Sequence, residues 1–292
     1  MTTIRIATRG SLQALTQSEG VAECLRTAGF DTELVRVDTL GDRTQADNVP
    51  LHSIGGQGVF VKEVQRAVLD GRADVAVHSA KDLPAGDAEG LQLGAFLPRR
   101  SAADVLIGNT LDGLAVGAPV ATGSVRRRAQ LRLVRPDLEF RELRGNITTR
   151  LERVPEGGAI VMALAALEVL GITDRVDDVL DPTRFVPAVG QGCVAVECRI
   201  DDRDIGPAVA GIDHAPTRRA VTIERAYLDE LGAGCTLPVG AYVDGELLHV
   251  FLADDAGSTA VTRAVELSGE GSRDLEAARQ TAREARETVA AR

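Results

Sequence analysis

The sequence predicts an α/β protein made of two α/β units followed by a small α+β domain. Over the first two thirds of the chain, short apolar strands alternate with amphipathic helices, which is typical of parallel α/β layers. From about residue 212 onward the pattern changes to closely spaced strands and a terminal helix. The 292 residues exceed the size at which a single hydrophobic core stops growing, so two or three domains are expected.

The first unit opens with an expected strand at 4–7. Ser11 is a candidate N-cap for a helix whose apolar residues recur at helical spacing until the chain reaches Gly29. There follow a strand at 33–37, a polar, glycine-rich loop at 41–58, a helix at 60–69 and a strand at 74–77. The loop lacks the GK[ST] ending and the GxGxxG spacing of phosphate loops, so it is either a mobile lid or a plain connection.

The second unit begins at Val105 and repeats the alternation. Its expected elements are strands at 119–121, 139–143 and 159–162 and helices at 125–134 and 148–154. An apolar strand at 194–198 is expected to return to the first unit and make that domain discontinuous. The predicted domains are therefore residues 1–97 with 191–211, residues 98–190, and residues 212–292.

The C-terminal domain is predicted from a hairpin signal. Strand patterns at 239–243 and 247–252 flank Asp244-Gly245, a dipeptide that favours tight hairpin turns. A third strand at 259–267 follows the turn at 254–258, and a helix begins at Arg273. This is the pattern of a three-stranded antiparallel sheet with a helix.

Composition limits the partners of the protein. The net charge of −10 argues against a general binder of nucleic acid or anionic membranes, because such proteins need a basic face. No apolar stretch approaches the ~20 residues of a membrane span, and the N-terminus lacks the apolar core of a signal peptide. A soluble, cytoplasmic protein is expected.

Neither the cysteines nor the histidines form a metal-ligand pattern. The four cysteines contain no CxxC pair, so reduced thiols are expected, and Cys24, Cys193 and Cys198 are interpreted as packing residues. Cys235 differs because it lies in a glycine-flanked loop between a helix and a strand. Such a loop can present a thiolate, although a lone loop cysteine is more often inert.

Arginines gather where strands give way to helices. The set consists of Arg9, Arg126, Arg127, Arg144 and Arg150, and four of these five lie at strand-to-helix junctions. In open α/β sheets, ligands bind at these carboxyl ends of the strands. Arg126 and Arg127 lie in the first turn of a helix capped by Ser124, where a cation typically costs about 0.3–1 kcal/mol. Because guanidinium groups match carboxylates, the set favours a ligand rich in carboxylates, while any one arginine alone reads as surface charge.

A lysine and a carboxylate follow the strand at 74–77 in the segment His78-Ser79-Ala80-Lys81-Asp82. Asp82 could act as a general acid or as the counterion of a cationic intermediate, and Lys81 could hold a carboxylate. The alternative is an aspartate that stabilises the turn before a proline, beside a solvated lysine.

Six segments in order resemble the porphobilinogen deaminase family over about residues 4–242. They are IRIATRGSLQALTQS, GGQGVFVKEVQRAVLDGRADVAVHSAKDLP, ATGSVRRRAQL, LRGNITTRL, FVPAVGQGCVAVECR and ERAYLDELGAGCTLPVGAY. The resemblance implies three domains, of which two are related to type II periplasmic-binding-protein folds with the active cleft between them. The third would carry a cofactor cysteine on a loop.

The resemblance also implies roles for individual residues. Cys235 would attach a dipyrromethane primer through a thioether, and Asp82 would be the catalytic carboxylate. The acetate and propionate groups of primer and substrate would be held by Arg9, Ser79, Lys81, Thr122, Ser124, Arg126, Arg127, Arg144 and Arg150. One departure is Gln57, which stands where the family often has a lysine. The contact that this lysine would make from the lid is expected to be weaker or neutral here, or to be supplied by a different basic residue.

The implied activity is a transferase that condenses four porphobilinogen molecules into the linear tetrapyrrole hydroxymethylbilane and releases ammonia, for porphyrin and heme biosynthesis. The family suggests a monomer that needs neither metal nor nucleotide. Two other classes stay open. One is a small-anion binding module of the same two-lobed fold, which gives no role to Asp82 or Cys235; the other is a thiol-dependent transferase, which needs a base near Cys235.

Overall fold

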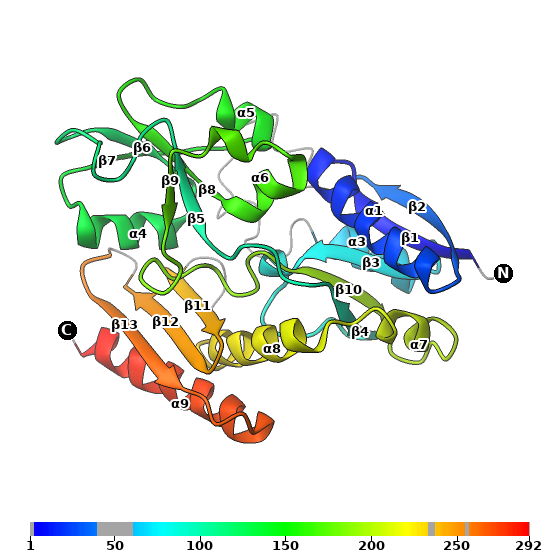
Figure 1. Ribbon diagram of the computed structural model, residues 1–292. Helices are drawn as coiled ribbons and strands as arrows, with labels where there is room; N and C mark the ends of the chain where they lie inside the picture. The colour runs from blue at the N-terminus through cyan, green and yellow to red at the C-terminus, as the bar shows by residue number, and fades with distance from the viewer. Residues whose placement is uncertain (1–2, 40–60, 233–236, 255–256, 292) are drawn as a thin grey trace. The chain divides into compact units, whose positions relative to one another are not determined.

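The structure is a computed structural model that describes residues 3–39, 61–232, 237–254 and 257–291. The chain divides into two compact units, residues 1–100 with 192–219 and residues 101–191 with 220–292. Each contains a five-stranded sheet covered by helices, and the second also contains a three-stranded sheet (Figure 1). The predicted loop at 41–58 and the loop around Cys235 lie outside the described residues.

The sheet of the first unit has the order β2-β1-β3-β10-β4. Its strands are β1 (Thr3–Arg9), β2 (Asp31–Val37), β3 (Val75–Ser79), β4 (Leu91–Phe96) and β10 (Val194–Arg199). β1 is parallel to β2 and β3, whereas β10 is antiparallel to β3 and β4. The predicted return of the strand at 194–198 is therefore confirmed. The parallel pattern that the sequence predicts holds for β1, β2 and β3 but not for β10, because a strand that does not follow a βαβ crossover can enter in either direction.

Helices cover both faces of this sheet. They are α1 (Leu12–Thr27), α3 (Lys62–Leu69), α7 (Ile205–Ala210) and the short 3-10 helix η2 (Ala80–Asp82). α1 begins where the sequence predicts, because the Ser11 hydroxyl accepts from the Ala14 N–H at 3.3 Å. Residues of α1 and α7 pack in one apolar cluster with β1, β3 and β10, whereas α3 packs in a second cluster that includes other residues of β1 and β3.

The sheet of the second unit repeats the arrangement in the order β7-β6-β8-β5-β9. Its strands are β5 (Asp104–Ile107), β6 (Pro119–Ala121), β7 (Glu139–Arg141), β8 (Ala159–Ala163) and β9 (Asp178–Leu180). β6 is parallel to β7 and β8, and β5 is antiparallel to β8 and β9. The helices are α4 (Val125–Val134), α5 (Ile147–Leu151), α6 (Leu164–Leu170) and the 3-10 helix η3 (Thr173–Arg175).

The three-stranded sheet is antiparallel, as predicted. Helix α8 (Ala215–Glu230) leads into it, and the strands are β11 (Val239–Asp244), β12 (Leu247–Ala253) and β13 (Ala260–Glu266). The first hairpin turns at Gly245-Glu246, one residue later than predicted, because Asp244 still pairs with Leu247 and Gly245 takes the left-handed conformation at φ 58°.

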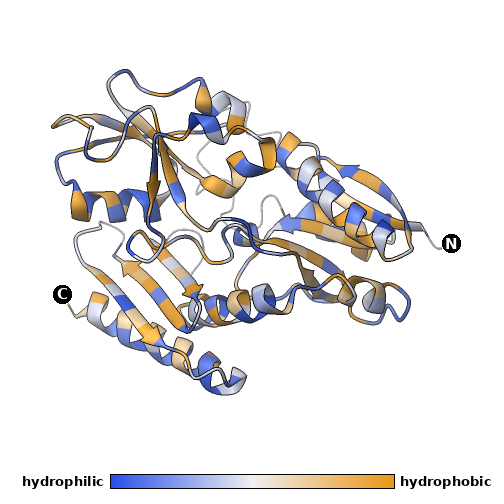
Figure 2. Ribbon diagram, viewed as in Figure 1, coloured by the Kyte–Doolittle hydropathy of each residue, from blue (hydrophilic) through white to orange (hydrophobic). Residues whose placement is uncertain are grey.

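Helix α9 (Gly271–Ala290) closes the chain and lies along β12 and β13. Its hydrophilic colouring contrasts with the hydrophobic β12 in Figure 2, and it buries small residues such as Ala278, Ala282 and Ala285. No helix within the described ranges is long and apolar enough to cross a membrane. The division of residues 212–292 into a third domain stays a prediction.

Candidate active site

A pocket in the first unit brings together three of the predicted site residues. Arg9, the last residue of β1, lines it together with Ser79 at the end of β3 and Asp82 in η2. The start of α1 lines it as well, through Ser11 and neighbouring residues. The pocket thus lies at the carboxyl ends of two parallel strands, where α/β sheets bind ligands. It offers a cation, hydroxyl groups and a carboxylate.

The chain order explains how these residues meet. β1 and β3 are adjacent and parallel, so the residues that follow them emerge at the same edge of the sheet. The Ser79 hydroxyl donates to Gln17 Oε1 at 3.0 Å and is thereby held against α1. Lys81 lies half-buried between Ala80 and Asp82 in η2.

Beneath this pocket lies a buried polar group that the sequence did not predict. His78, which also lines the pocket, places Nε2 3.0 Å from Glu197 Oε2, and both residues are buried. The two atoms lie within ion-pair distance, but their geometry is not that of a hydrogen bond. Gln65 Nε2 donates to both Glu197 oxygens at 3.1 and 2.9 Å.

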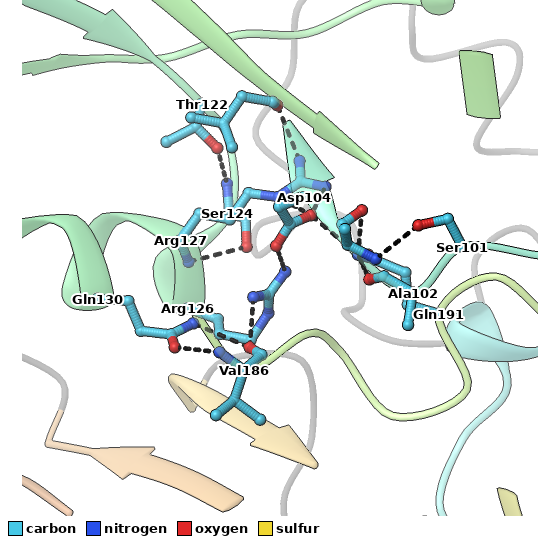
Figure 3. Close-up of polar contacts among 12 residues, drawn as sticks. Ser101, Ala102, Asp104, Thr122, Ser124, Arg126, Arg127, Gln130, Val186 and Gln191 are labelled. Carbon is cyan, nitrogen blue, oxygen red and sulfur yellow. Dashed lines mark hydrogen bonds and ion pairs between the residues drawn. The ribbon is translucent and has the colours of Figure 1, made fainter. Parts of the chain in front are cut away.

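In the second unit, Arg126 and Arg127 are buried and share one carboxylate (Figure 3). Arg126 Nη2 donates to Asp104 Oδ2 at 2.7 Å, and Arg127 donates to Asp104 Oδ1 from Nε at 3.0 Å and from Nη2 at 2.6 Å. Two backbone carbonyls accept the other hydrogen bonds of the pair: Val186 O accepts from Arg126 Nη1, and Val161 O accepts from Arg127 Nη1. Both guanidinium groups are therefore held in fixed orientations by the protein itself.

Asp104 is ionised in this environment. Burial opposes its ionisation, yet attraction to Arg126 and Arg127 outweighs burial and holds the pKa of the carboxyl well below its ordinary value. Burial lowers the pKa of Arg126, an effect that Asp104 counters, and a guanidinium stays protonated in proteins. Two cations and one anion leave the cluster with a surplus positive charge.

The other predicted residues of the second unit lie at neighbouring strand ends. Ser124 is the N-cap of α4, its hydroxyl accepts from Arg127 N at 3.4 Å, and its own N–H donates to Thr122 Oγ1 at 3.2 Å. Arg150 lies in α5 and donates from Nε to Gly145 O at 2.8 Å, and Arg144 is half-buried just before that helix.

The structure thus gathers the predicted residues into two groups, each at the parallel strand ends of its own sheet. The first unit contributes Arg9, Ser79, Lys81 and Asp82, and the second contributes Thr122, Ser124, Arg126, Arg127, Arg144 and Arg150. Cys235 lies outside the described residues. The sequence did not predict Asp104, Gln191, His78 or Glu197 as site residues. For Asp104 and Glu197 the available signal was a carboxylate inside an otherwise apolar strand, as in SAADVLI and VAVECR.

Comparison with known proteins defines first the class and then the family. A family model described as "Porphobilinogen deaminase, dipyromethane cofactor binding domain" matches residues 4–206. This places the chain in the class of proteins that bind a dipyrromethane cofactor. Relatives named porphobilinogen deaminase cover nearly all of it. One from Acidothermus cellulolyticus is 43% identical over 94% of this chain and 86% of its own length, and one from Xanthomonas axonopodis pv. citri is 45% identical over 94% and 92%.

The chain belongs to the porphobilinogen deaminase family, as its motifs predict. The predicted dipyrromethane cofactor is confirmed by the same match, whereas the residues that bind it stay predictions. Among solved structures, a nutrient-binding protein from Burkholderia cenocepacia bound to methionine is similar over 74% of this chain and 93% of that chain, with 12% identity and a TM-score of 0.44.

Proposed function

We propose that this chain is a hydroxymethylbilane synthase, a transferase that joins four porphobilinogen molecules into a linear tetrapyrrole and releases ammonia. The observation that carries the proposal is the pocket in which Arg9, Ser79 and Asp82 meet. A substrate with acetate and propionate groups on a pyrrole needs cations and hydroxyls for its carboxylates and an anion near its ring nitrogen. The pocket supplies a cation and hydroxyl groups as well as a carboxylate at the same edge of the sheet.

The residues present fit a covalently bound dipyrromethane. Arg126 and Arg127 keep a surplus positive charge after pairing with Asp104, which suits a group rich in carboxylates. Cys235 would attach the group through a thioether, and Thr122, Ser124, Arg144 and Arg150 would hold its side chains. When bound, the group supplies the nucleophilic α-carbon of its terminal pyrrole.

Asp82 is the proposed catalytic carboxylate. Loss of ammonia from porphobilinogen leaves a cationic, electrophilic pyrrole, and a carboxylate at its nitrogen stabilises the positive charge. The Asp82 carboxylate can also hold and return a proton at that nitrogen. Arg9, Lys81 and Ser79 bind the acetate and propionate groups, so that the ring nitrogen is oriented toward Asp82.

We further propose that the protein acts as a cytoplasmic monomer without nucleic-acid or membrane partners. The net charge of −10 supports this, since it gives no general attraction to polyanions. The cations of the site are local and partly neutralised, as the Asp104 cluster illustrates.

Intact-mass measurement of the purified protein tests the proposal. We expect an excess mass equal to two linked pyrroles, together with consumption of porphobilinogen. Cys235→Ala should abolish both in a folded protein. Cys24→Ala is the matched control, because Cys24 lies half-buried on α1, and it should keep both.

An adduct that persists in Cys235→Ala would refute the attachment site. An unchanged chain that carries no adduct and binds porphobilinogen without releasing ammonia would favour the small-anion binding module instead.

A further inference from the structure

Asp104 is the centre of the polar cluster drawn in Figure 3. It is fully buried at the start of β5, and its two oxygens accept three bonds from Arg127 and Arg126. Gln191 Nε2 donates a further bond to Asp104 Oδ1 at 2.9 Å and another to Ala102 O at 2.7 Å. Both oxygens of this carboxylate are therefore engaged, Oδ1 by three donors.

The bonds to Asp104 also determine which donors of the two arginines can bind a ligand. A guanidinium has five N–H donors. Within the described residues, hydrogen bonds engage two donor nitrogens of Arg126, one of them with Asp104, and three donor nitrogens of Arg127, two of them with Asp104. Donors therefore remain on both groups, in directions that the carboxylate and the two backbone carbonyls set.

The net charge of the Asp104 cluster limits which ligand groups it can bind. Without Asp104, two guanidinium groups would lie buried side by side with no compensating charge, which is strongly unfavourable. With it, the cluster carries one surplus positive charge. Such a cluster matches a single carboxylate group rather than two.

We propose that Asp104 is a positioning residue for ligand binding, which orients Arg126 and Arg127 and limits their pair to one carboxylate of a bound pyrrole. This inference rests on the proposed function. Asp104 itself contacts no substrate, and its influence passes through the two guanidinium groups. Gln191 supports it by fixing the Oδ1 side of the carboxylate.

The test compares four proteins: the unchanged chain, Asp104→Asn, Gln191→Met and Asp274→Asn. Asn keeps the shape of Asp104 but removes the charge and turns an amide N–H₂ toward arginine donors. Gln191→Met removes the donated bond and keeps the ion pairs. Asp274→Asn is the matched control, because Asp274 is also a fully buried carboxylate of the second unit. Asp274 lies in the first turn of α9 and accepts hydrogen bonds from Ser268.

Each protein is measured for melting temperature, for the fraction carrying the two-pyrrole mass, and for KM and kcat per mass-bearing molecule. For Asp104→Asn we expect KM for porphobilinogen to rise at least ~10-fold and the mass-bearing fraction to fall, with kcat within about threefold. Gln191→Met should shift KM about threefold in the same direction. Asp274→Asn should lose thermal stability and keep KM.

A folded Asp104→Asn with KM and mass-bearing fraction near those of the unchanged chain would overturn the inference. If Asp104→Asn does not fold, Gln191→Met decides, and an unaltered KM there overturns it equally. Absence of the adduct and of turnover in the unchanged chain is a different result, because it refutes the proposed function without reference to any variant.

Discussion

Single lysine replacements of three adjacent arginines should separate them by the bonds that each guanidinium makes. Arg127 donates from three nitrogens, twice to Asp104 and once to Val161 O. A lysine ammonium keeps the charge but reaches only part of that set, because its donors radiate from one atom. We expect Arg127→Lys to lower the free energy of unfolding by about 3 kcal/mol, the lower end of the range for breaking a buried ion pair.

Smaller losses of stability are expected at the two neighbouring arginines, Arg126 and Arg128. Arg126 donates to Asp104 and to Val186 O. Gln130 Nε2 also donates to Val186 O, so this carbonyl keeps a donor in Arg126→Lys. The expected cost is about 1.5–3 kcal/mol, the value of one charge-assisted hydrogen bond. Arg128 is the matched control, because its partner Glu142 is 61% exposed, and Arg128→Lys should cost at most about 1 kcal/mol.

Thermal unfolding followed by circular dichroism, together with urea denaturation, measures these differences. At about 2–4 °C per kcal/mol, the Arg127→Lys protein should melt roughly 6–12 °C below the unchanged chain. The expected loss of stability is large only for an arginine that is buried and bonded to Asp104. A shift of ~1 °C or less for Arg127→Lys, or equal shifts at all three positions, would therefore refute the reasoning.

Three further outcomes are expected. Asp82→Asn should keep the melting temperature and lower single-turnover ammonia release by at least ~10²-fold; a loss of stability with normal release per folded molecule would instead identify a turn aspartate. Burial of Asp74 opposes its ionisation, but hydrogen bonds and charge from Arg5 outweigh burial and lower its pKa, so the stability it contributes is present above about pH 4 and is lost as the pH falls. Denaturation series should therefore show Asp74→Asn less stable by about 1–2 kcal/mol at pH 7, with the gap closing in acid. Gly158→Ala should cost at least about 2 kcal/mol, because its Cβ would lie 1.9 Å from a backbone oxygen, whereas Gly86→Ala meets nothing within 4 Å and should be neutral in the same measurement.

Elements with a local signal could be predicted closely from the sequence. The predicted strand at 119–121 and helix at 125–134 coincide with β6 and α4, because Ser124 provides a side-chain cap and the apolar residues of the strand are contiguous. The three C-terminal strands are predicted from the turn residues that separate them. Such signals can be read from the sequence because the interacting residues lie within one turn of helix or within one hairpin.

Two of the missed elements are short apolar runs. β5 covers Asp104–Ile107 and β9 covers Asp178–Leu180, too few residues for periodicity to distinguish strand from helix. The direction of β10 was also not predictable, because antiparallel pairing with β3 is decided by where the chain re-enters the sheet and not by the residues 194–199 themselves.

In the candidate site, too, local sequence patterns predict some residues and not others. Residues that follow strand ends, such as Arg9 and Asp82, could be placed from the motifs, and the structure brings both to one pocket. Their supporting partners could not. Gln65 and Glu197 are 132 residues apart in sequence, and nothing in either local pattern relates one to the other.

The place of β10 in the first sheet has a consequence for synthesis of the chain. β10 lies between β3 and β4, yet all of residues 101–191 precede it on the ribosome. At about 5–20 residues per second, the roughly 100 residues between β4 and β10 take about 5–20 s to translate. During that interval β3 has an unpaired edge and β4 has no neighbour in its sheet, and such edges pair readily with other chains. The N-terminal unit, although translated first, therefore completes its sheet only after the middle of the chain has emerged.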